Sequence, residues 1–139
     1  MIKLLENFEF CKKCTKCCTK TEMILTLNDL KRLKKVSEEF YTYSNGFYRL
    51  KNVNGKCIFL ENNICKIYEL RPMGCRAYPL VYDERRGVIL DDDCPLKTIP
   101  KKELLKGVKE LLIALKEIER DYGYKVNWDL FRRSVNSIF

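Results

Sequence analysis

Hydrophobic residues recur at helical spacing within residues 22–43, and lysine and arginine fill most of the positions between them. The start of this helix is readable in "TLND", where Thr26 at the N-cap and Asp29 three positions on can each bond the other's backbone N–H. The pattern therefore predicts an amphipathic helix that begins after Thr26. The apolar positions expected on its buried face are Leu27, Leu30, Leu33 and Phe40.

Residues 100–120 show the clearest helical period in the chain. Pro100 suits the first turn of this helix, and Gly123 is expected to end it. Asn127 can then cap a final short helix, and we expect both helices to serve the core and to carry no chemistry. The apolar positions are Leu104, Val108, Leu111, Leu115 and Ile118 in the first helix, and Trp128, Phe131, Val135 and Ile138 in the second.

The segment between these helices has shorter apolar runs separated by turn signals. "FYRLKNVNGKCIFLENNICKIY" (47–68) predicts a meander of hairpins, with Cys57 and Cys65 on neighbouring strands near the "ENN" turn. "ELRPMGCR" predicts a turn or a single helical turn, in which Gly74 frees the backbone before Cys75. "YPLVYDERRGVILDDDCP" predicts another hairpin around "ERRG", and no internal repeat is apparent.

These elements predict a small α+β protein. The length of 139 residues fits one domain, 1–139, in which short β-hairpins and loops are organised around cysteine-ligated metal sites and packed with N-terminal and C-terminal helices. The opening residues contain no apolar run of signal-peptide length, and charges interrupt every apolar stretch, so we expect a cytoplasmic location and no membrane segment.

Charge adds a second consideration. The formal net charge is +8, which permits a nucleic-acid partner. Each four-cysteine site would carry about −2, whether it holds zinc or an oxidised four-iron cluster, so two such sites would reduce the net charge to about +4. Part of the lysine excess then balances thiolates. The sequence names no protein or redox partner.

Eight cysteines and no histidine define the candidate chemistry. Four of the cysteines lie in "CKKCTKCC", where disulfides, a metal or cluster site, and redox catalysis are all conceivable. A cytoplasmic chain keeps its thiols reduced, which favours metal. The spacing C-x-x-C-x-x-C of Cys11, Cys14 and Cys17 is typical of a segment that ligates three corners of a four-iron cluster, the fourth thiolate often coming from a Cys-Pro pair such as Cys94-Pro95.

Zinc is the alternative metal. All-cysteine tetrahedral sites commonly hold structural zinc, and hairpin cysteines such as Cys57 and Cys65 resemble the knuckles of zinc ribbons. Adjacent side chains diverge, so Cys17 and Cys18 cannot easily serve one tetrahedral centre, and two sites become the simplest arrangement. One possible partition sets Cys11, Cys14, Cys17 and Cys94 against Cys18, Cys57, Cys65 and Cys75.

The sequence contains no motif for nucleotide binding, histidine-dependent nucleophilic catalysis or radical S-adenosylmethionine chemistry. The six glycines are scattered, so no phosphate-cradling loop or dinucleotide fingerprint is present. Without histidine there is no cysteine–histidine or serine–histidine nucleophile. The C-x-x-x-C-x-x-C pattern of radical S-adenosylmethionine enzymes is also absent, because Thr21 stands where the third cysteine would be.

"CKKCTKCC", "GKCIFLENNICKIYELRPMGCRAYP" and the later "CP" occur together in the order found in a known family. From about Cys11 to Cys94 the chain resembles the YkgJ-type cysteine cluster proteins, described as a zinc- or iron-chelating domain with a CxxCxxCC motif. The resemblance implies that all eight cysteines are metal-ligand candidates: Cys11, Cys14, Cys17, Cys18, Cys57, Cys65, Cys75 and Cys94.

Two arginines flank Cys75 in the matching block. Arg71 and Arg76 could donate to cluster sulfurs or thiolates, or could pair with Glu69 or another carboxylate. Tyr68 and Tyr78 are expected to screen the site from water.

Three functions follow as hypotheses. The first is a cytoplasmic protein with one or two 4Fe-4S clusters, serving electron transfer, cluster handling or a cluster-assisted reaction in a larger complex. The second is a module stabilised by Zn²⁺ that binds nucleic acid or an acidic protein. The third is an S-adenosylmethionine-dependent methyl-transfer enzyme, because flagellin lysine N-methylase shares the cysteine motif.

Overall fold

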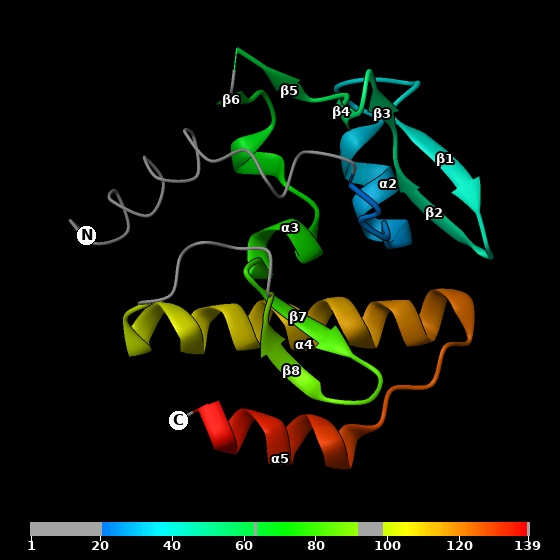
Figure 1. The fold of residues 1–139 in the computed structure, drawn as a ribbon. Coiled ribbons are helices and arrows are strands. Elements are labelled where there is room, and N and C mark those ends of the chain that lie inside the picture. The colour runs from blue at the N-terminus through cyan, green and yellow to red at the C-terminus, as the bar shows by residue number, and fades with distance from the viewer. Residues whose placement is uncertain (1–20, 63, 92–98, 139) are drawn as a thin grey trace. The chain divides into compact units, whose positions relative to one another are not determined.

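The computed structural model describes residues 21–62, 64–91 and 99–138, and the chain divides into two compact units, Met1–Pro72 and Met73–Phe139. The predicted α+β class is confirmed, because both units combine short antiparallel hairpins with helices (Figure 1). The expectation that all 139 residues form one domain stays a prediction.

In the first unit a short helix is followed by three consecutive hairpins. The predicted capping box is confirmed at Thr26, whose backbone N–H donates to Asp29 Oδ2 at 3.1 Å while its Oγ1 accepts from the backbone N–H of Asp29 at 3.0 Å. Each hairpin forms its own two-stranded sheet. The elements are α2 (Leu27–Leu33), β1 (Tyr41–Ser44), β2 (Phe47–Leu50), β3 (Asn52–Val53), β4 (Lys56–Cys57), β5 (Leu60–Glu61), β6 (Ile64–Cys65) and the 3₁₀ helix η2 (Tyr68–Leu70).

Two details of the predicted first helix are wrong. Leu27 is 49% exposed rather than buried, and Phe40 is fully buried but lies beyond the helix, which ends at Leu33. The competing signal is the β-rich sequence around Asn45-Gly46. Both of these residues have left-handed φ angles (52° and 87°), as a tight hairpin turn requires, so residues 41–50 form strands instead.

The core of the first unit gathers around Phe40. Its ring lies 5.8 Å from that of Phe59, between centroids, and both side chains are buried. Leu25 and Leu33 are completely buried, and Leu30 and Leu50 nearly so. The apolar side of α2 therefore contributes two of its three predicted leucines to this core.

The second unit places a β-hairpin between helices. It contains α3 (Met73–Ala77), β7 (Leu80–Asp83), β8 (Gly87–Leu90), α4 (Lys101–Tyr122) and α5 (Trp128–Ile138). Figure 1 shows the β7–β8 hairpin between α4 and α5. The predicted hairpin and both C-terminal helices are confirmed, as are their caps. Gly123 ends α4 with φ 71°, and Asn127 Oδ1 accepts from the backbone N–H of Leu130 at 3.0 Å.

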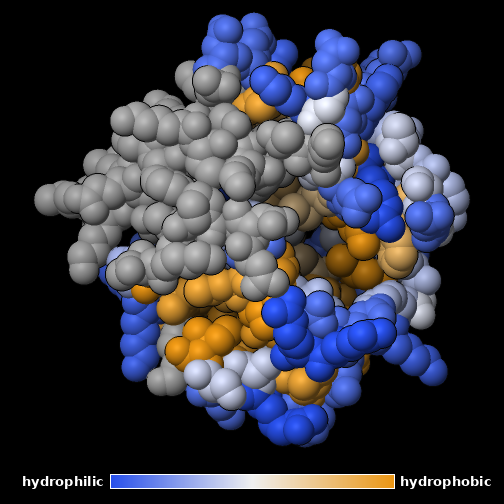
Figure 2. Space-filling view, viewed as in Figure 1, coloured by the Kyte–Doolittle hydropathy of each residue, from blue (hydrophilic) through white to orange (hydrophobic). Residues whose placement is uncertain are grey.

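The core of this unit is formed from all of its elements. Orange, hydrophobic residues gather over this part of the molecule in Figure 2. Trp128, Val135 and Ile138 pack against the buried cluster as predicted. The buried members are Ala77, Leu80, Val88, Leu111, Leu115, Val126 and Phe131.

Candidate metal-ligating site

Two consecutive hairpins of the same design present one cysteine each. In β3–β4 the cross-strand partner of Cys57 is Asn52, and in β5–β6 the partner of Cys65 is Leu60. Beyond each pair one further backbone bond extends the hairpin, from Ile58 N–H to the Lys51 carbonyl at 2.9 Å and from Lys66 N–H to the Phe59 carbonyl at 2.8 Å. The pairing seen in residues 51–58 therefore recurs eight residues later, in the described part of 59–66, as a structural repeat.

The sequence analysis missed this repeat because its two copies share only an asparagine and the cysteine. Asn54 and Asn62 occupy equivalent turn positions with φ angles of 53° and 51°, and in the first turn Gly55 follows at 78°. Left-handed residues of this kind let a two-residue turn match the twist of the strands. The sequence signal that could have identified the repeat is an asparagine followed three positions later by a cysteine.

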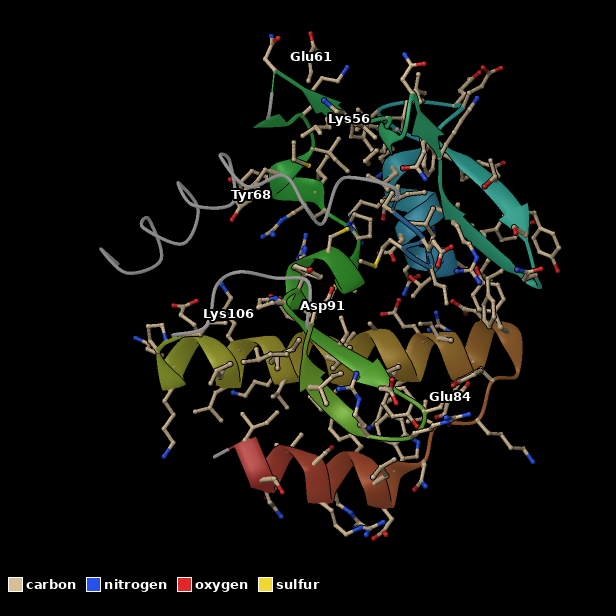
Figure 3. The ribbon with its side chains drawn as sticks, in the orientation of Figure 1. Lys56, Glu61, Tyr68, Glu84, Asp91 and Lys106 are labelled. Atoms are coloured by element: carbon tan, nitrogen blue, oxygen red, sulfur yellow. The ribbon has the colours of Figure 1, made fainter. Side chains whose placement is uncertain are left out.

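The prediction that Cys57 and Cys65 lie on neighbouring strands is wrong. β4 pairs with β3 and β6 pairs with β5, in separate two-stranded sheets. Each tight turn folds the chain back onto the residues just before it, so each cysteine strand pairs with its own preceding strand. Lys56 and Glu61 mark the two hairpins in Figure 3. Cys57 is 6% exposed, whereas Cys65 is partly exposed.

Asn52 links the first of these hairpins to the segment that follows the N-terminal cysteine motif. Its Oδ1 accepts from the backbone N–H of Thr21 at 3.1 Å, and its Nδ2 donates to the Thr21 carbonyl at 2.8 Å. Thr21 is buried and stands three residues after Cys18 in sequence. Asn52 is itself the cross-strand partner of Cys57. Its side-chain amide therefore holds the main chain at Thr21, just after the motif, against the hairpin that carries Cys57. Sequence reasoning missed Asn52 because its bonding partner lies 31 residues away.

Arg71 is oriented by Tyr68, one turn before it. The Arg71 Nε–H donates to the Tyr68 carbonyl at 2.9 Å, and the guanidinium carbon lies 3.9 Å from the centre of the Tyr68 ring, which is labelled in Figure 3. Stacking and hydrogen bonding together hold this planar cation in one orientation. The donation of Arg71 and Arg76 to cluster sulfurs stays a prediction.

Arg32 holds the backbone of the same segment. Its Nη2 donates to the Arg71 carbonyl at 3.0 Å and to Asp29 Oδ1 at 2.9 Å. The Asp29 side chain is completely buried, so the ion pair is partly shielded from water. Arg32 is a second residue that the sequence analysis missed, because nothing in its local pattern points to residue 71.

Cys75 lies in the middle of α3 and is partly exposed. The predicted helical turn is confirmed, and Gly74 belongs to that helix, directly before Cys75. Tyr78 follows α3, and its hydroxyl donates to Asp91 Oδ2 at 2.6 Å, at the labelled position after β8 in Figure 3. The expectation that Tyr68 and Tyr78 screen the site from water stays a prediction.

The remaining candidate ligands cannot be placed. Cys11, Cys14, Cys17, Cys18 and Cys94 lie outside the described residues. Among the residues that are described, no three cysteine, aspartate or glutamate side chains gather to hold an ion. The thiols that the structure describes are one from each of two hairpins of the first unit and, separately, one from a short helix of the second unit. Thiolates of this kind suit zinc or iron–sulfur clusters rather than hard cations.

The fold and these thiols define a small cysteine-rich α+β protein in which each described candidate ligand comes from a different short element. The chain belongs to the CxxCxxCC family, described as "Putative zinc- or iron-chelating domain", whose pattern matches residues 10–95. The predicted family resemblance is confirmed. The match covers every one of the eight cysteines.

Two relatives from Methanocaldococcus jannaschii are similar to the chain. Uncharacterized protein MJ0661 is 37% identical over 86 residues, which is 55% of this chain and 47% of the relative. Uncharacterized protein MJ0939 is 30% identical over 137 residues, which is 91% of this chain and 47% of the relative. The chain thus spans about half the length of each of these proteins. No solved structure gives a significant match.

Within the described ranges, every helix is too short or too polar to cross a membrane.

Proposed function

We propose that this chain is an iron–sulfur protein whose cysteine thiolates hold one or two four-iron clusters. The family description supports zinc or iron binding. Eight cysteines without any histidine supply enough thiolates for two Cys₄ sites, and the triple Cys11, Cys14 and Cys17 has the spacing of a cluster-binding segment.

The observation that carries the choice of iron–sulfur over zinc is the separation of Cys57 and Cys65. A zinc-ribbon knuckle brings two cysteines, spaced by two to four residues, into one turn. Here each hairpin carries one cysteine, and seven residues separate the two cysteines. Single thiolates from dispersed elements instead complement a motif that already provides three closely spaced ligands.

Each described residue has a definite part in this proposal. Cys57, Cys65 and Cys75 would supply thiolates, and the burial of Cys57 would keep water from its sulfur. Such clusters exchange single electrons and respond to nearby hydrogen-bond donors. Electron transfer, cluster handling and a cluster-assisted reaction in a larger complex are therefore the roles open to the protein.

The test is metal and sulfide analysis of protein purified without oxygen. We expect iron and acid-labile sulfide in equal amounts, with a brown colour. Separate Cys57→Ser, Cys65→Ser and Cys75→Ser variants should each lose iron, whereas Asn136→Ala, an exposed position on α5, should keep it. A colourless protein that carries zinc alone would refute the cluster and establish the zinc-stabilised module instead.

A further inference from the structure

Three tyrosines share one face of the β1–β2 hairpin. The register pairs Tyr43 with Tyr48 and Tyr41 with Leu50, and cross-strand partners lie on the same side of a sheet. The Tyr48 ring makes edge contacts with both others, at 5.0 Å from Tyr43 and 5.5 Å from Tyr41 between ring centres. The result is a continuous row of three rings along the hairpin, which we call the tyrosine row.

The tyrosine row opens to solvent at its far end. Tyr43 is 64% exposed, while Tyr41 and Tyr48 are partly exposed. Cross-strand aromatic pairs stabilise hairpins, so hairpin stability accounts for the contact between Tyr43 and Tyr48. It does not account for the large free area of the Tyr43 ring, which a ligand could cover.

Cations lie at the other end of the row. Lys34 Nζ is 5.9 Å from the centre of the Tyr41 ring. Lys31 and Lys35 are also exposed; Lys31 precedes Lys34 by three residues, about one helical turn, and Lys35 follows Lys34 directly, beyond the end of α2. Residues 31–51 contain six basic side chains and two acidic ones, Glu38 and Glu39. Arg32 is paired with Asp29 and Arg49 lies on the opposite face of the hairpin, so the positive charge near the rings comes from the exposed lysines.

The hairpin is held rigidly at its base. On the side away from β1, the backbone N–H of Leu25 donates to the Tyr48 carbonyl at 2.8 Å, and the backbone N–H of Leu50 donates to the Met23 carbonyl at 3.0 Å. Arg49 reinforces this attachment on the opposite face, where it donates to the Glu22 carbonyl at 3.0 Å. The rings are thus presented on a preformed surface, which lowers the entropic cost of binding.

We propose that the tyrosine row, with Lys31, Lys34 and Lys35, binds single-stranded nucleic acid. Aromatic rings stack on bases of any sequence, while lysines along one side neutralise the phosphates. Single strands are favoured over duplexes because exposed rings need unpaired base faces. The combination of exposed rings and nearby cations is what favours single-stranded nucleic acid as the partner. This inference does not depend on which metal the cysteines hold.

The test is fluorescence anisotropy with a labelled oligothymidylate of about 12 nucleotides and a duplex of the same length, titrated with the full chain as purified. We expect the single strand to bind more tightly than the duplex. Tyr43→Ala should weaken single-strand binding at least about fivefold, the lower bound for losing one stacked base, whereas Tyr43→Phe should keep it. Thr42→Ala, the neighbouring exposed residue on the opposite face of β1, is the matched control and should bind as the wild type does.

The salt dependence of the binding affinity tests the contribution of the three lysines separately from that of the rings. If each of the three neutralises one phosphate, replacing them together with glutamine should flatten the plot of log affinity against log salt by about 2. Circular dichroism and metal content should match the wild type in every variant, since these side chains are exposed. Absence of oligonucleotide binding, equal affinity for the duplex, or an unchanged Tyr43→Ala affinity would each overturn the proposal.

Discussion

Arg32 and Arg71 are joined by a hydrogen bond from the Nη2 group of Arg32 to the main-chain carbonyl of Arg71, at 3.0 Å and across 39 positions of sequence. The same nitrogen contacts Asp29 Oδ1 at 2.9 Å. Asp29 also completes the capping box of α2. One arginine therefore connects the start of a helix to the segment that leads into "RPMGCR", and it neutralises a carboxylate with no exposed surface.

Replacing Arg32 should destabilise the first unit. Arg32→Met leaves Asp29 buried without this charge partner and the Arg71 carbonyl without this donor, so we expect the free energy of unfolding to fall by about 1–3 kcal/mol. Urea unfolding followed by circular dichroism measures the loss. The matched control is Arg133→Met, which breaks an exposed ion pair with Asp129 and should cost less than about 1 kcal/mol. Equal losses for the two variants would contradict the structural role of Arg32.

Asn52 should affect metal retention as well as stability. Asn52→Ala removes both hydrogen bonds to Thr21 and frees the main chain between the cysteine motif and the Cys57 hairpin. We expect bound metal to be lost to a chelator about tenfold more readily, as happens when a residue that orients a ligand is removed. Asn52→Asp keeps only the acceptor and should give an intermediate rate.

Asn136→Ala provides the control for Asn52, because it removes the same amide from an exposed position on α5. Its chelator sensitivity should equal that of the wild type. Were Asn52→Ala to retain metal as well as this control, the Thr21 contact would be purely local and would have no part in the site.

The features that the sequence predicted correctly are those encoded within a few residues. Thr26 and Asp29 recognise each other across one helical turn, and Asn127 caps α5 in the same local manner. Gly123 ends α4 because a left-handed residue there costs glycine little. In each case the side chain and the backbone group that it satisfies lie close together along the chain, so the pattern alone is sufficient.

The features that were missed depend either on a competing local turn or on contacts between distant segments. Phe40 was assigned to a helix because its spacing fitted, although the Asn45-Gly46 turn draws the following residues into a hairpin. Arg32 and Asn52 look like ordinary surface residues until the fold brings Arg71 and Thr21 to them. No periodic pattern carries that information, since either residue could point to solvent in another topology.

Gly107 should resist replacement even though it lies inside a helix. A Cβ at this position would lie 2.9 Å from Leu80 Cδ1 and 3.4 Å from the Ala77 carbonyl oxygen, and Leu80 is only 2% exposed. Alanine is the better helix former by about 1 kcal/mol, but overpacking a filled core costs about 1–3 kcal/mol. We expect Gly107→Ala to lower the free energy of unfolding by about 1 kcal/mol, measured by urea unfolding.

The same substitution should weaken the candidate site, because Ala77 belongs to α3 with Cys75. A shift of α3 away from α4 would move that thiol and reduce the metal content. Lys109→Ala, on the exposed side of α4, should change stability by less than about 0.5 kcal/mol and leave the metal content intact. A Gly107→Ala protein at least as stable as the wild type would show that α3 and Leu80 have room to move.

Stability at high pH should depend on Tyr124. Its hydroxyl donates to Glu84, labelled in Figure 3 at the β7–β8 turn, and burial followed by this hydrogen bond raises the pKa of Tyr124. A raised pKa means that the folded protein favours the neutral phenol. The contribution of Tyr124 is therefore complete below the unfolded pKa of about 10 and is lost progressively as the pH rises above it.

The difference in unfolding free energy between wild type and Tyr124→Phe should therefore be constant below about pH 9 and shrink as the pH rises from about 10 to about 11. Because water reaches this pair, we expect the effect to stay below about 1 kcal/mol. Taking the difference between two proteins at each pH cancels the titration of the other tyrosines and lysines. In a Glu84→Gln background the pH dependence of this difference should weaken, because the carboxylate that opposes ionisation is gone. A difference that grows with pH would reverse the sign of the argument and exclude the neutral phenol as the stabilising form.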